Sequence, residues 1–371
     1  MAPDIRAAPG SPGHARPRRG GAGSNSIKAD RTLTAGYDVG GAHLKVALLR
    51  EGVIVHASQI PCPLWRGLEQ LDLALAQALE ITGGAHRHTV TMTGELADIF
   101  PDRYTGVVML VERLEAALGP GCRFWLGRRG LGSAEEAAVH DEDVASANFL
   151  ATATVAGRLA REGLLIDMGS TTTDIIALGG GVPVATGWSD GERLRTGELV
   201  YTGLTRTPVM AVTTRSVFQG QWQGLARDPF ATMADVRRVL GELPGGVDQH
   251  GTSDGRGKSV AESRARLARC FGRDAGPSED ADWGEAARVI ADVQLASIVD
   301  GCRQVGANSH GGQHGGQVVA AGIGAEVVAQ VAAGLGMPSV TFGQLVGAPP
   351  EWTDWATRCA PAVSVAMLAA E

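Results

Sequence analysis

Residues 163–178 (GLLIDMGSTTTDIIAL) place two carboxylates and four hydroxyls in and beside a turn between two apolar strands. Successive backbone amides in such a turn form a concavity that binds anions, and Ser and Thr hydroxyls add donors. Gly169 permits a backbone conformation closed to other residues and a close approach by a ligand. Carboxylates beside a phosphate pocket indicate a divalent cation, most often Mg²⁺ that keeps several waters. The pattern predicts a phosphate and metal site, and a polar hairpin without a ligand is the alternative.

An earlier stretch of the chain repeats this pattern. Residues 37–49 (YDVGGAHLKVALL) overlay residues 166–178 (IDMGSTTTDIIAL) at a constant shift of 129 residues. The equivalent pairs are Asp38 with Asp167, Gly40 with Gly169, Gly41 with Ser170, and Lys45 with Asp174. Two such hairpins, each followed by helical sequence, predict duplicated half-domains whose turns face a single cleft.

The equivalent positions Lys45 and Asp174 carry opposite charges. We interpret this as a division of roles, in which Lys45 neutralises phosphate oxygens while Asp174 binds the metal or acts as a base. Asp38 is the second candidate for Mg²⁺, bound directly or through water. The alternative is a salt bridge between Lys45 and Asp174 across an empty cleft.

A third candidate element is the turn Gly322-Ile323-Gly324, which precedes a predicted helix. The amides and the dipole at a helix N-terminus favour an anion or a nucleoside phosphate. The predicted catalytic residues are Asp174, Asp38 and Lys45. The predicted phosphate-binding residues are Gly40, Gly41, Gly169, Ser170, Thr171, Thr172, Thr173, Arg206, Gly322 and Gly324.

The elements that must position these residues alternate between strands and helices, which predicts an α/β layer architecture. Before the second hairpin, strands are expected at 33–38, 44–49, 53–60, 88–93 and 122–126, and helices at 67–81, from Glu95, and at 106–118. Asp141 is a predicted N-cap for a long helix that continues through Leu159. Later elements are a strand at 209–213, helices from Thr232, to about 272, at 282–305 and at 361–370, and a strand, turn and helix at 318–335.

The predicted domains are residues 35–160 and 161–371, after a disordered tail at 1–34. A helical insertion is expected at about 215–305, and a polar loop at 245–259 within it. Residues 306–317 carry His310 and His314 on a glycine-rich background with no adjacent carboxylate or Cys. A flexible loop is therefore favoured over a metal site there.

Composition excludes several classes of protein. The chain has 371 residues, enough for two domains, and 44% hydrophobic residues supply a large core. A net charge of −7 argues against a general nucleic-acid surface. The five Cys are far apart and never form a CxxC pair, which is typical of free thiols in a reducing compartment. No apolar run reaches the roughly 18–20 residues of a membrane span, so we expect a cytoplasmic protein with no membrane partner. The oligomeric state stays open, a homo-oligomer included.

The two hairpins and the glycine turn, at 37–45, 166–174 and 320–325, resemble the phosphate-one, phosphate-two and adenosine motifs of the ASKHA superfamily. This resemblance implies the actin-like (ribonuclease H-like) fold of sugar kinases, Hsp70 and acetate kinase. Two duplicated α/β domains would then enclose a central cleft.

Five longer phrases resemble hydantoinase/oxoprolinase-related proteins of the tetrahydromethanopterin-linked one-carbon pathway. They are MTGELADIF (92–100), SANFLATA (146–153), IDMGSTTTDII (166–176), GELVYTGLTRTPV (197–209) and DPFATMADV (228–236). The resemblance covers about residues 33–370, and archaeal members of the family make methanofuran. Bacterial members are implied to make methylofuran-type cofactors, whose phenolic acceptor carries either tyrosine or tyramine; the sequence does not decide between the two.

The activity that this resemblance implies is a Mg²⁺-dependent alkyl transfer. [5-(Aminomethyl)furan-3-yl]methyl diphosphate would condense with a γ-glutamyl phenolic amine to give an aryl ether and diphosphate. Two phosphate-binding hairpins and Mg²⁺ suit a departing diphosphate, because negative charge grows on it in the transition state. ATP is not expected to be required.

There are four weaker candidates, and only Arg206 among them lies in a family phrase. Arg206 would clamp a phosphate or a carboxylate, or serve the structure. Lys258 and Asp254 would belong to a lid over the substrate. His43 would accept a proton near the leaving group, or be an ordinary turn histidine.

Two rival functions stay open because a fold does not settle a function. One is an ATP-dependent kinase or a hydantoinase/oxoprolinase-like amidohydrolase. The other is a non-catalytic nucleotide-binding subunit of the same pathway.

Overall fold

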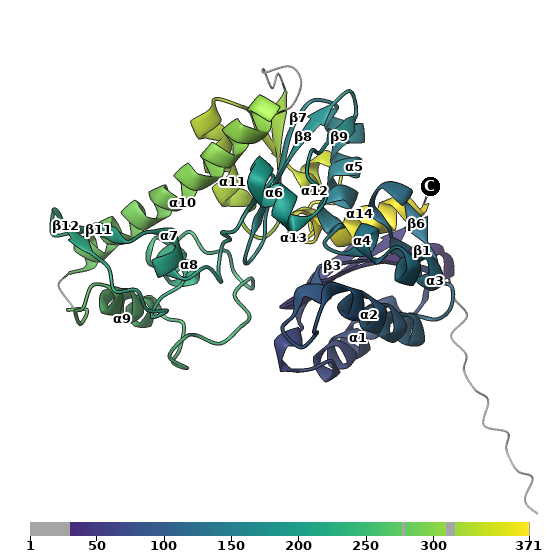
Figure 1. Ribbon diagram of the computed structural model, residues 1–371, viewed down its shortest axis with the longest axis horizontal. Coiled ribbons are helices and arrows are strands. Elements are labelled where there is room, and N and C mark those ends of the chain that lie inside the picture. The colour runs from purple at the N-terminus through teal and green to yellow at the C-terminus, as the bar shows by residue number, and fades with distance from the viewer. Residues whose placement is uncertain (1–29, 277–278, 309–315, 371) are drawn as a thin grey trace, which may run out of the picture.

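Two mixed β-sheets, each built around one of the two hairpins, form the frame of the protein in a computed structural model (Figure 1). The structure describes residues 30–276, 279–308 and 316–370. The first sheet has the strand order β3-β2-β1-β4-β5-β6. Its strands are β1 (Asp30–Val39), β2 (His43–Arg50), β3 (Val53–Pro61), β4 (Ala85–Met92), β5 (Arg123–Trp125) and β6 (Leu131–Gly132).

The second sheet repeats this topology in the order β10-β8-β7-β13-β14, with β9 on β8. Its strands are β7 (Gly163–Met168), β8 (Thr173–Gly179), β9 (Val182–Val184), β10 (Leu199–Val200), β13 (Gln317–Ala321) and β14 (Ser339–Thr341). In both sheets the first strand runs antiparallel to the second and parallel to a later strand.

The strand registers confirm the internal repeat. Asp38 pairs with Lys45 across β1 and β2, and Asp167 pairs with Asp174 across β7 and β8. Both hairpins therefore present the same two positions at the same end, as the constant shift of 129 residues predicts.

Helices α5 (Asn148–Ala160) and α14 (Ala360–Ala370) pack between the two sheets. They share one apolar core with Leu49 from the first sheet and Leu165 from the second. The C-terminal helix lies so close to β1 that a Cβ at Gly36 would stand 2.0 Å from the carbonyl oxygen of Ala362. The last helix of the chain thus covers the first sheet, beside β1 in Figure 1.

Other helices cover the outer faces of the sheets. Helices α1 (Glu69–Thr82) and α2 (Arg103–Leu118) share a core with the first sheet. Helices α10 (Asp280–Asn308) and α11 (Ala325–Leu335) do the same for the second sheet. The shorter helices are α3 (Ala134–Val139), α4 (Asp141–Val144), α6 (Asp190–Thr196), α12 (Phe342–Leu345) and α13 (Thr353–Arg358). Among the described residues, no helix is both long and apolar enough to cross a membrane.

The insertion forms a separate core at the far end of α10, on the left of Figure 1. It contains α7 (Val209–Val212), β11 (Arg215–Phe218), β12 (Gln221–Gly224), α8 (Met233–Val239) and α9 (Val260–Cys270). The aromatic rings of Phe218, Phe271 and Trp283 meet at its centre. Thr232 and Asp235 form the predicted capping box of α8.

Three predicted elements differ from the structure. The strand at 209–213 is wrong, because this segment is the helical turn α7, which aims both Val209 and Val212 at the insertion core. The long helix from Asp141 is also wrong: Ser146 has a φ of 53° and separates α4 from α5. The first strand begins at Asp30 rather than residue 33, since Asp30 already pairs with Ala85. Residues 30–34 therefore do not belong to a disordered tail.

Candidate functional site

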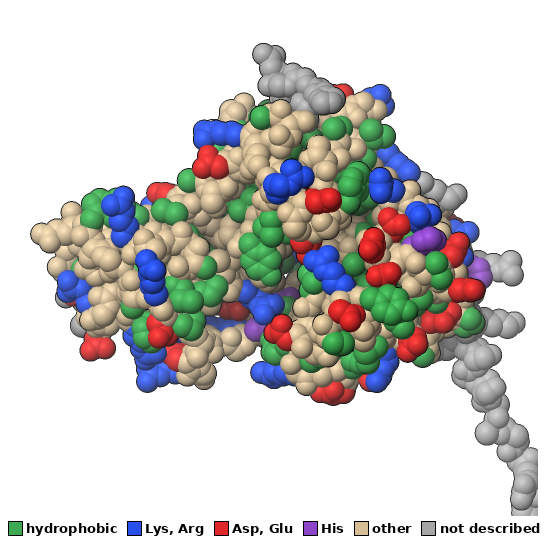
Figure 2. Space-filling view, viewed as in Figure 1, with side chains coloured by type: hydrophobic (Ala, Val, Ile, Leu, Met, Phe, Trp, Pro, Cys, Tyr) green, Lys and Arg blue, Asp and Glu red, His purple; other side chains and the backbone are tan. Residues whose placement is uncertain are grey.

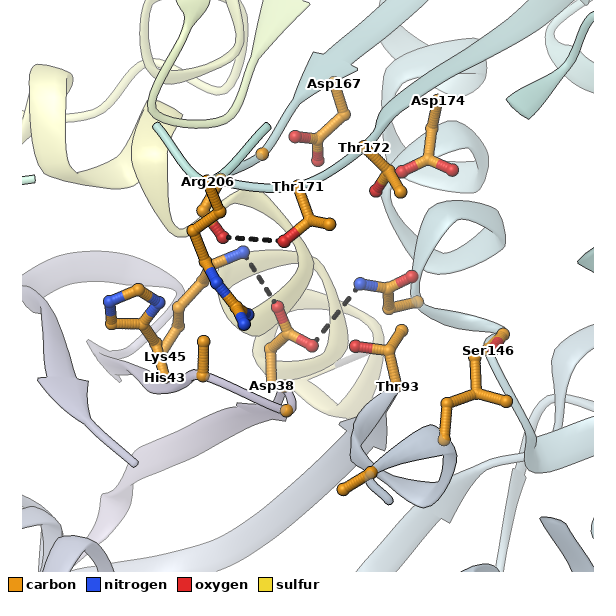
Figure 3. Close-up of a pocket in the computed structure, with 18 of the residues that line it drawn as sticks. Asp38, His43, Lys45, Thr93, Ser146, Asp167, Thr171, Thr172, Asp174 and Arg206 are labelled. Atoms are coloured by element: carbon orange, nitrogen blue, oxygen red, sulfur yellow. Dashed lines mark hydrogen bonds and ion pairs between the residues drawn. The ribbon is translucent and has the colours of Figure 1, made fainter. Parts of the chain in front are cut away.

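A cavity of about 690 Å³ lies between the two halves and is bordered by both hairpin turns. Figure 2 shows a hollow near the middle of the molecular face, with basic, acidic and His side chains around it. The predicted residues that line the cavity are Asp38, Gly40, Gly41, His43, Lys45, Gly169, Ser170, Thr171, Thr172, Asp174 and Arg206. In Figure 3, Asp167, Thr172 and Asp174 stand on one side of this cavity, and Asp38, His43 and Lys45 on the other. The structure thus brings the two repeated turns together around one space.

The first hairpin carries its own charge pair. The Lys45 ammonium lies 3.1 Å from a carboxylate oxygen of Asp38 (Figure 3). The Asn148 amide lies 3.4 Å from the other oxygen of this carboxylate. Burial alone would lower the pKa of Lys45, but the carboxylates of Asp38 and Asp167 raise it above its usual value. Lys45 is therefore a permanent cation at the cavity wall.

The second hairpin has two carboxylates and takes its cation from elsewhere. Arg193, on α6, donates to Asp174 at 2.5 Å and stacks over the Phe149 ring at 3.6 Å from its centroid. Its side chain is only 3% exposed. The alternative of a Lys45–Asp174 salt bridge is wrong, because each residue has a different partner.

Asp167 is left without an Arg or Lys ion-pair partner among the described residues. Burial raises its pKa to about 7, while the Lys45 cation acts in the opposite direction. Burial also raises the pKa of Asp174, and Arg193 opposes that shift. The pKa of Asp167 therefore lies near neutral pH.

The second turn is held in place by the segment that follows β10. The amides of Leu204 and Arg206 donate to the carbonyls of Gly169 and Ser170, at 2.9 Å and 2.8 Å. A Cβ at Gly203 would stand 2.5 Å from the Ser170 carbonyl carbon, so the backbones of the two segments are in direct contact. The family phrase at 197–209 therefore fixes the shape of the turn at 169–172.

Two details of this turn differ from expectation. The φ of Gly169 lies outside the left-handed region, so the turn does not need glycine for an unusual backbone conformation. What Gly169 contributes is the absence of a side chain. Thr173 is buried and donates its hydroxyl to the Thr202 carbonyl at 2.7 Å, away from the cavity lining. Ser170, Thr171 and Thr172 do line the cavity.

The glycines of the third element support the site without lining it. Gly322 has a φ of +79°, and a Cβ there would stand 2.3 Å from an oxygen of Asp167. The amides of Gly322 and Gly324 already donate, to the carbonyls of Thr357 and Met168. Ile323 is the residue of this turn that lines the cavity. The close packing of the turn fixes the Asp167 side chain in place.

The weaker candidates separate into two groups. Arg206 lines the cavity, stacks over Trp65 at 4.7 Å and forms no ion pair with any described residue. Lys258 and Asp254 instead bond within the insertion, to Asp248 and Arg266 respectively, and do not line the cavity. His310 and His314 lie outside the described residues.

Sequence reasoning missed several residues that shape the site. Arg193 lies in a polar stretch and Asn148 in the family phrase at 146–153, and in neither does the spacing distinguish a cavity-facing side chain from a surface one. The family phrases at 92–100 and 146–153 also meet here, because the Ser146 hydroxyl donates to the buried Glu95 carboxyl at 2.8 Å. The two family phrases were the available signal, although neither shows which of its side chains face the cavity.

Mg²⁺ at this cavity stays a prediction. Among the described residues no group of three or more His, Cys, Asp and Glu side chains forms a protein-only metal site. Mg²⁺ commonly needs only one or two carboxylates together with waters and substrate phosphates. Asp38 and Asp174 both line the cavity, and each already pairs with a cation, Lys45 and Arg193 respectively, so the metal role of either carboxylate stays a prediction.

Together the duplicated sheets, the paired hairpins and the cleft between them define the actin-like ASKHA class of proteins. A nucleotide-free acetone carboxylase shares this fold with a TM-score of 0.56 and 10% identity, over 91% of this chain and 70% of the carboxylase. The chain belongs to the hydantoinase/oxoprolinase family, whose sequence model matches residues 86–349.

Two archaeal relatives share one name. The (4-{4-[2-(gamma-L-glutamylamino)ethyl]phenoxymethyl}furan-2-yl)methanamine synthase of Methanocaldococcus jannaschii is 30% identical over 240 residues, which span 64% of this chain and 71% of the relative. Its namesake from Methanococcus vannielii is 33% identical over 106 residues, 29% of this chain and 47% of that protein. This chain is thus related to a small-molecule-processing synthase.

Proposed function

We propose that this protein is a transferase that joins a furfuryl-type diphosphate to a phenol. The donor would be [5-(aminomethyl)furan-3-yl]methyl diphosphate, and the acceptor a γ-glutamyl amine of the tyramine or tyrosine type. The observation that supports this most is the pair of hairpin turns around one cavity that also holds Lys45 and Arg206, a guanidinium without an ion-pair partner among the residues described. Such an arrangement suits a diphosphate more than a neutral substrate.

The reaction makes one carbon–oxygen bond and breaks another. A lone pair of the phenol oxygen attacks the methylene carbon on the furan, and the electrons of the cleaved bond leave with the diphosphate. The phenol proton passes to the Asp167 carboxylate, whose pKa of about 7 suits a general base at neutral pH. The ordinary pKa of a phenol is about 10, so attack at neutral pH benefits from such a base.

The cations of the cavity act on the leaving group. Lys45 and Arg206 would stabilise the negative charge that grows on the diphosphate in the transition state. Asp38 would hold Mg²⁺, which when bound supplies further charge stabilisation on the phosphate oxygens. The amides and hydroxyls of the turn at 169–172 would orient the diphosphate.

A direct assay tests this function. Purified protein is incubated with Mg²⁺, the furan diphosphate and γ-glutamyltyramine in the absence of ATP. We expect the aryl ether, detected by mass spectrometry, and one diphosphate released for each ether formed. Chelation of Mg²⁺ by EDTA should stop the reaction.

The same assay separates the rival functions. Ether or ADP that appears only when ATP is added would overturn the proposal in favour of an ATP-dependent kinase or amidohydrolase. Binding of both substrates with no product under any condition would indicate a non-catalytic subunit. Replacement of tyramine by tyrosine in the acceptor identifies which phenol is the substrate.

A further inference from the structure

Large hydrophobic side chains stand exposed at the rim of the cavity, although its floor is polar. Trp65 is 37% exposed, Leu96 is 46% exposed and Tyr201 is 66% exposed, and all three line the cavity. Exposed apolar side chains scattered singly are ordinary on a protein surface, but a convergent set beside a polar pocket marks a binding site. We name Trp65, Leu96 and Tyr201 the apolar rim.

The rim is shared between the two halves of the molecule. Trp65 lies in a 3₁₀ turn (Leu64–Arg66), and Leu96 ends another (Gly94–Leu96), both in the first half. Tyr201 follows β10 in the second half, directly before the segment that holds the phosphate-binding turn. A ligand at the rim would therefore touch both halves while its reacting end reaches the floor.

Trp65 is a positioned platform rather than a loose surface residue. The amide of its neighbour Leu64 donates to the Gly41 carbonyl in the first hairpin turn at 3.0 Å. The His250 ring packs against the indole at 5.3 Å between centroids, and the Arg206 guanidinium stacks over it. An aromatic ring held in this way binds another aromatic ring with little loss of side-chain entropy.

The insertion contributes to this platform. The side-chain amide of Gln249 donates to the Gln59 carbonyl, and that of Gln59 donates to the Gln249 side chain, both at 3.2 Å. This reciprocal pair of hydrogen bonds holds the polar loop of the insertion on β3. The next residue of the loop, His250, packs against the rings of Trp65 and His43. The loop thus serves the cavity through Gln249 and His250, not through Lys258 or Asp254.

We propose that the apolar rim is the acceptor subsite and binds the aryl ring of the phenolic substrate. This inference rests on the proposed function, because that function places a diphosphate on the polar floor and needs a phenol above it. A ring held between Tyr201, Leu96 and Trp65 would direct its hydroxyl oxygen toward the floor. Its polar γ-glutamyl tail would extend to the cavity mouth.

Two exposed positions give the test, since their truncation should leave the fold intact. In Tyr201→Ala and Leu96→Ala we expect the Kd and KM for γ-glutamyltyramine to rise by about tenfold for the tyrosine and about threefold for the leucine. The Kd for inorganic diphosphate with Mg²⁺, measured by calorimetry, should stay within roughly twofold, because both residues lie off the floor. Tyr201→Phe should restore acceptor binding, since the ring rather than the hydroxyl makes the contact.

Trp222→Ala is the matched control. Trp222 is 60% exposed and stacks under Arg215, as Trp65 does under Arg206, but it lies on β12 and does not line the cavity. Its truncation should change neither constant.

Acceptor binding is measured by saturation-transfer NMR with γ-glutamyltyramine alone, so that it does not depend on turnover. If the wild type binds the acceptor and the rim variants lose it, the subsite stands even where no ether forms, and the reaction alone is wrong. If ether forms with a wild-type KM for the phenol in the rim variants, the reaction stands and the subsite is wrong. A loss of diphosphate affinity without a loss of acceptor affinity would also overturn the subsite.

Discussion

The two hairpins share one backbone geometry but balance their charge in opposite ways. In the first, the carboxylate of Asp38 and the ammonium of Lys45 occupy paired positions and neutralise each other at 3.1 Å. In the second, the same two positions are both acidic, and Arg193 from α6 neutralises one of them. The cation of the first hairpin is therefore built into the repeat, whereas that of the second is supplied from outside it.

This difference teaches which carboxylate remains available for chemistry. Asp38 and Asp174 each have a cation within hydrogen-bond distance, whereas Asp167 has none in the part of the chain that the structure describes. Burial of this carboxylate raises its pKa to about 7, and such perturbed pKa values are common at functional sites. The sequence pattern alone favours Asp174 as the general base, because this position of the repeat carries a lysine in the first hairpin and an acid in the second. The contacts favour Asp167 instead, because Asp174 pairs with Arg193.

The largest effect should follow from Asp167→Asn, which removes the proposed base and keeps the shape. We expect turnover to fall by about 10²–10⁴-fold, the usual contribution of a general base. The measurement is kcat for ether formation under saturating substrates. Asp38→Asn provides the comparison from the first hairpin, and its defect should diminish as Mg²⁺ is increased, because Asp38 is assigned to the metal. Equal turnover in Asp167→Asn and the wild type would remove Asp167 from the mechanism.

Asp167 should also set a pH dependence of two kinds. Turnover should fall below about pH 7, since the base must be unprotonated to accept the phenol proton.

Stability should depend on pH as well. The folded pKa of Asp167, about 7, lies above the ordinary value of 3.8, so the folded protein retains a proton that the unfolded chain releases. The resulting stability is fully present below pH 3.8 and is lost as the pH rises through 7. Asp167→Asn should therefore unfold at a higher temperature than the wild type at pH 8; an unchanged Tm at pH 8 together with an unchanged pH profile would contradict the assignment.

The second largest effect tests the built-in cation. Lys45→Met keeps the aliphatic stem but removes the charge, and we expect kcat/KM for the furan diphosphate to fall by about 10²–10³-fold. Because Asp38 loses its partner, the variant should also be less stable, which denaturant unfolding measures. Lys45→Arg is the matched control, since it keeps the charge and should recover part of the activity. Unchanged diphosphate affinity and turnover in Lys45→Met would end the phosphate role of this residue.

The third prediction separates structure from chemistry at the second hairpin. Asp174→Asn removes the nearest counter-charge of the buried Arg193 and leaves the more distant Asp190 at 4.0 Å, so we expect a loss of about 3 kcal/mol in the free energy of unfolding. Its loss of turnover should be well below that of Asp167→Asn. Arg193→Gln combined with Asp174→Asn should recover part of the lost stability, because it removes both members of the pair. If Asp174→Asn instead abolishes turnover and keeps wild-type stability, Asp174 is the metal ligand or base that the sequence pattern suggests.

The repeat explains how much of this site was accessible from sequence. Local patterns identify both hairpins, their register and the two-sheet architecture, because glycine turns, strand periodicity and a constant shift all leave marks in consecutive residues. Local sequence patterns do not show which residues form ion pairs with the charged residues of the hairpins. Arg193 lies on a different element from Asp174, and only the packing of α6 beside β8 brings them together. The same holds for Ser146, whose left-handed φ breaks a helix that side-chain periodicity alone would continue.

The smallest effects should come from the turn glycines, and they sharpen the comparison most finely. Neither Gly40 nor Gly169 has a φ in the left-handed region, and a Cβ would stand 3.1 Å from the His43 carbonyl in the first turn but 3.5 Å from the Thr172 carbonyl in the second. Gly169→Ala should therefore fold normally and change the free energy of unfolding by at most about 1 kcal/mol, and Gly40→Ala should be slightly less stable than Gly169→Ala.

If a diphosphate approaches these backbones, the added methyl group will still raise the KM for the diphosphate by a few fold in both variants, because the methyl group contacts the ligand and not the protein. Gly322→Ala is the contrast, since its φ of +79° and the 2.3 Å approach to Asp167 predict loss of the folded site itself. An unchanged KM for the diphosphate in both Gly169→Ala and Gly40→Ala would mean that no ligand contacts the turn backbones, and the clamp formed by the two hairpins would then act through side chains alone.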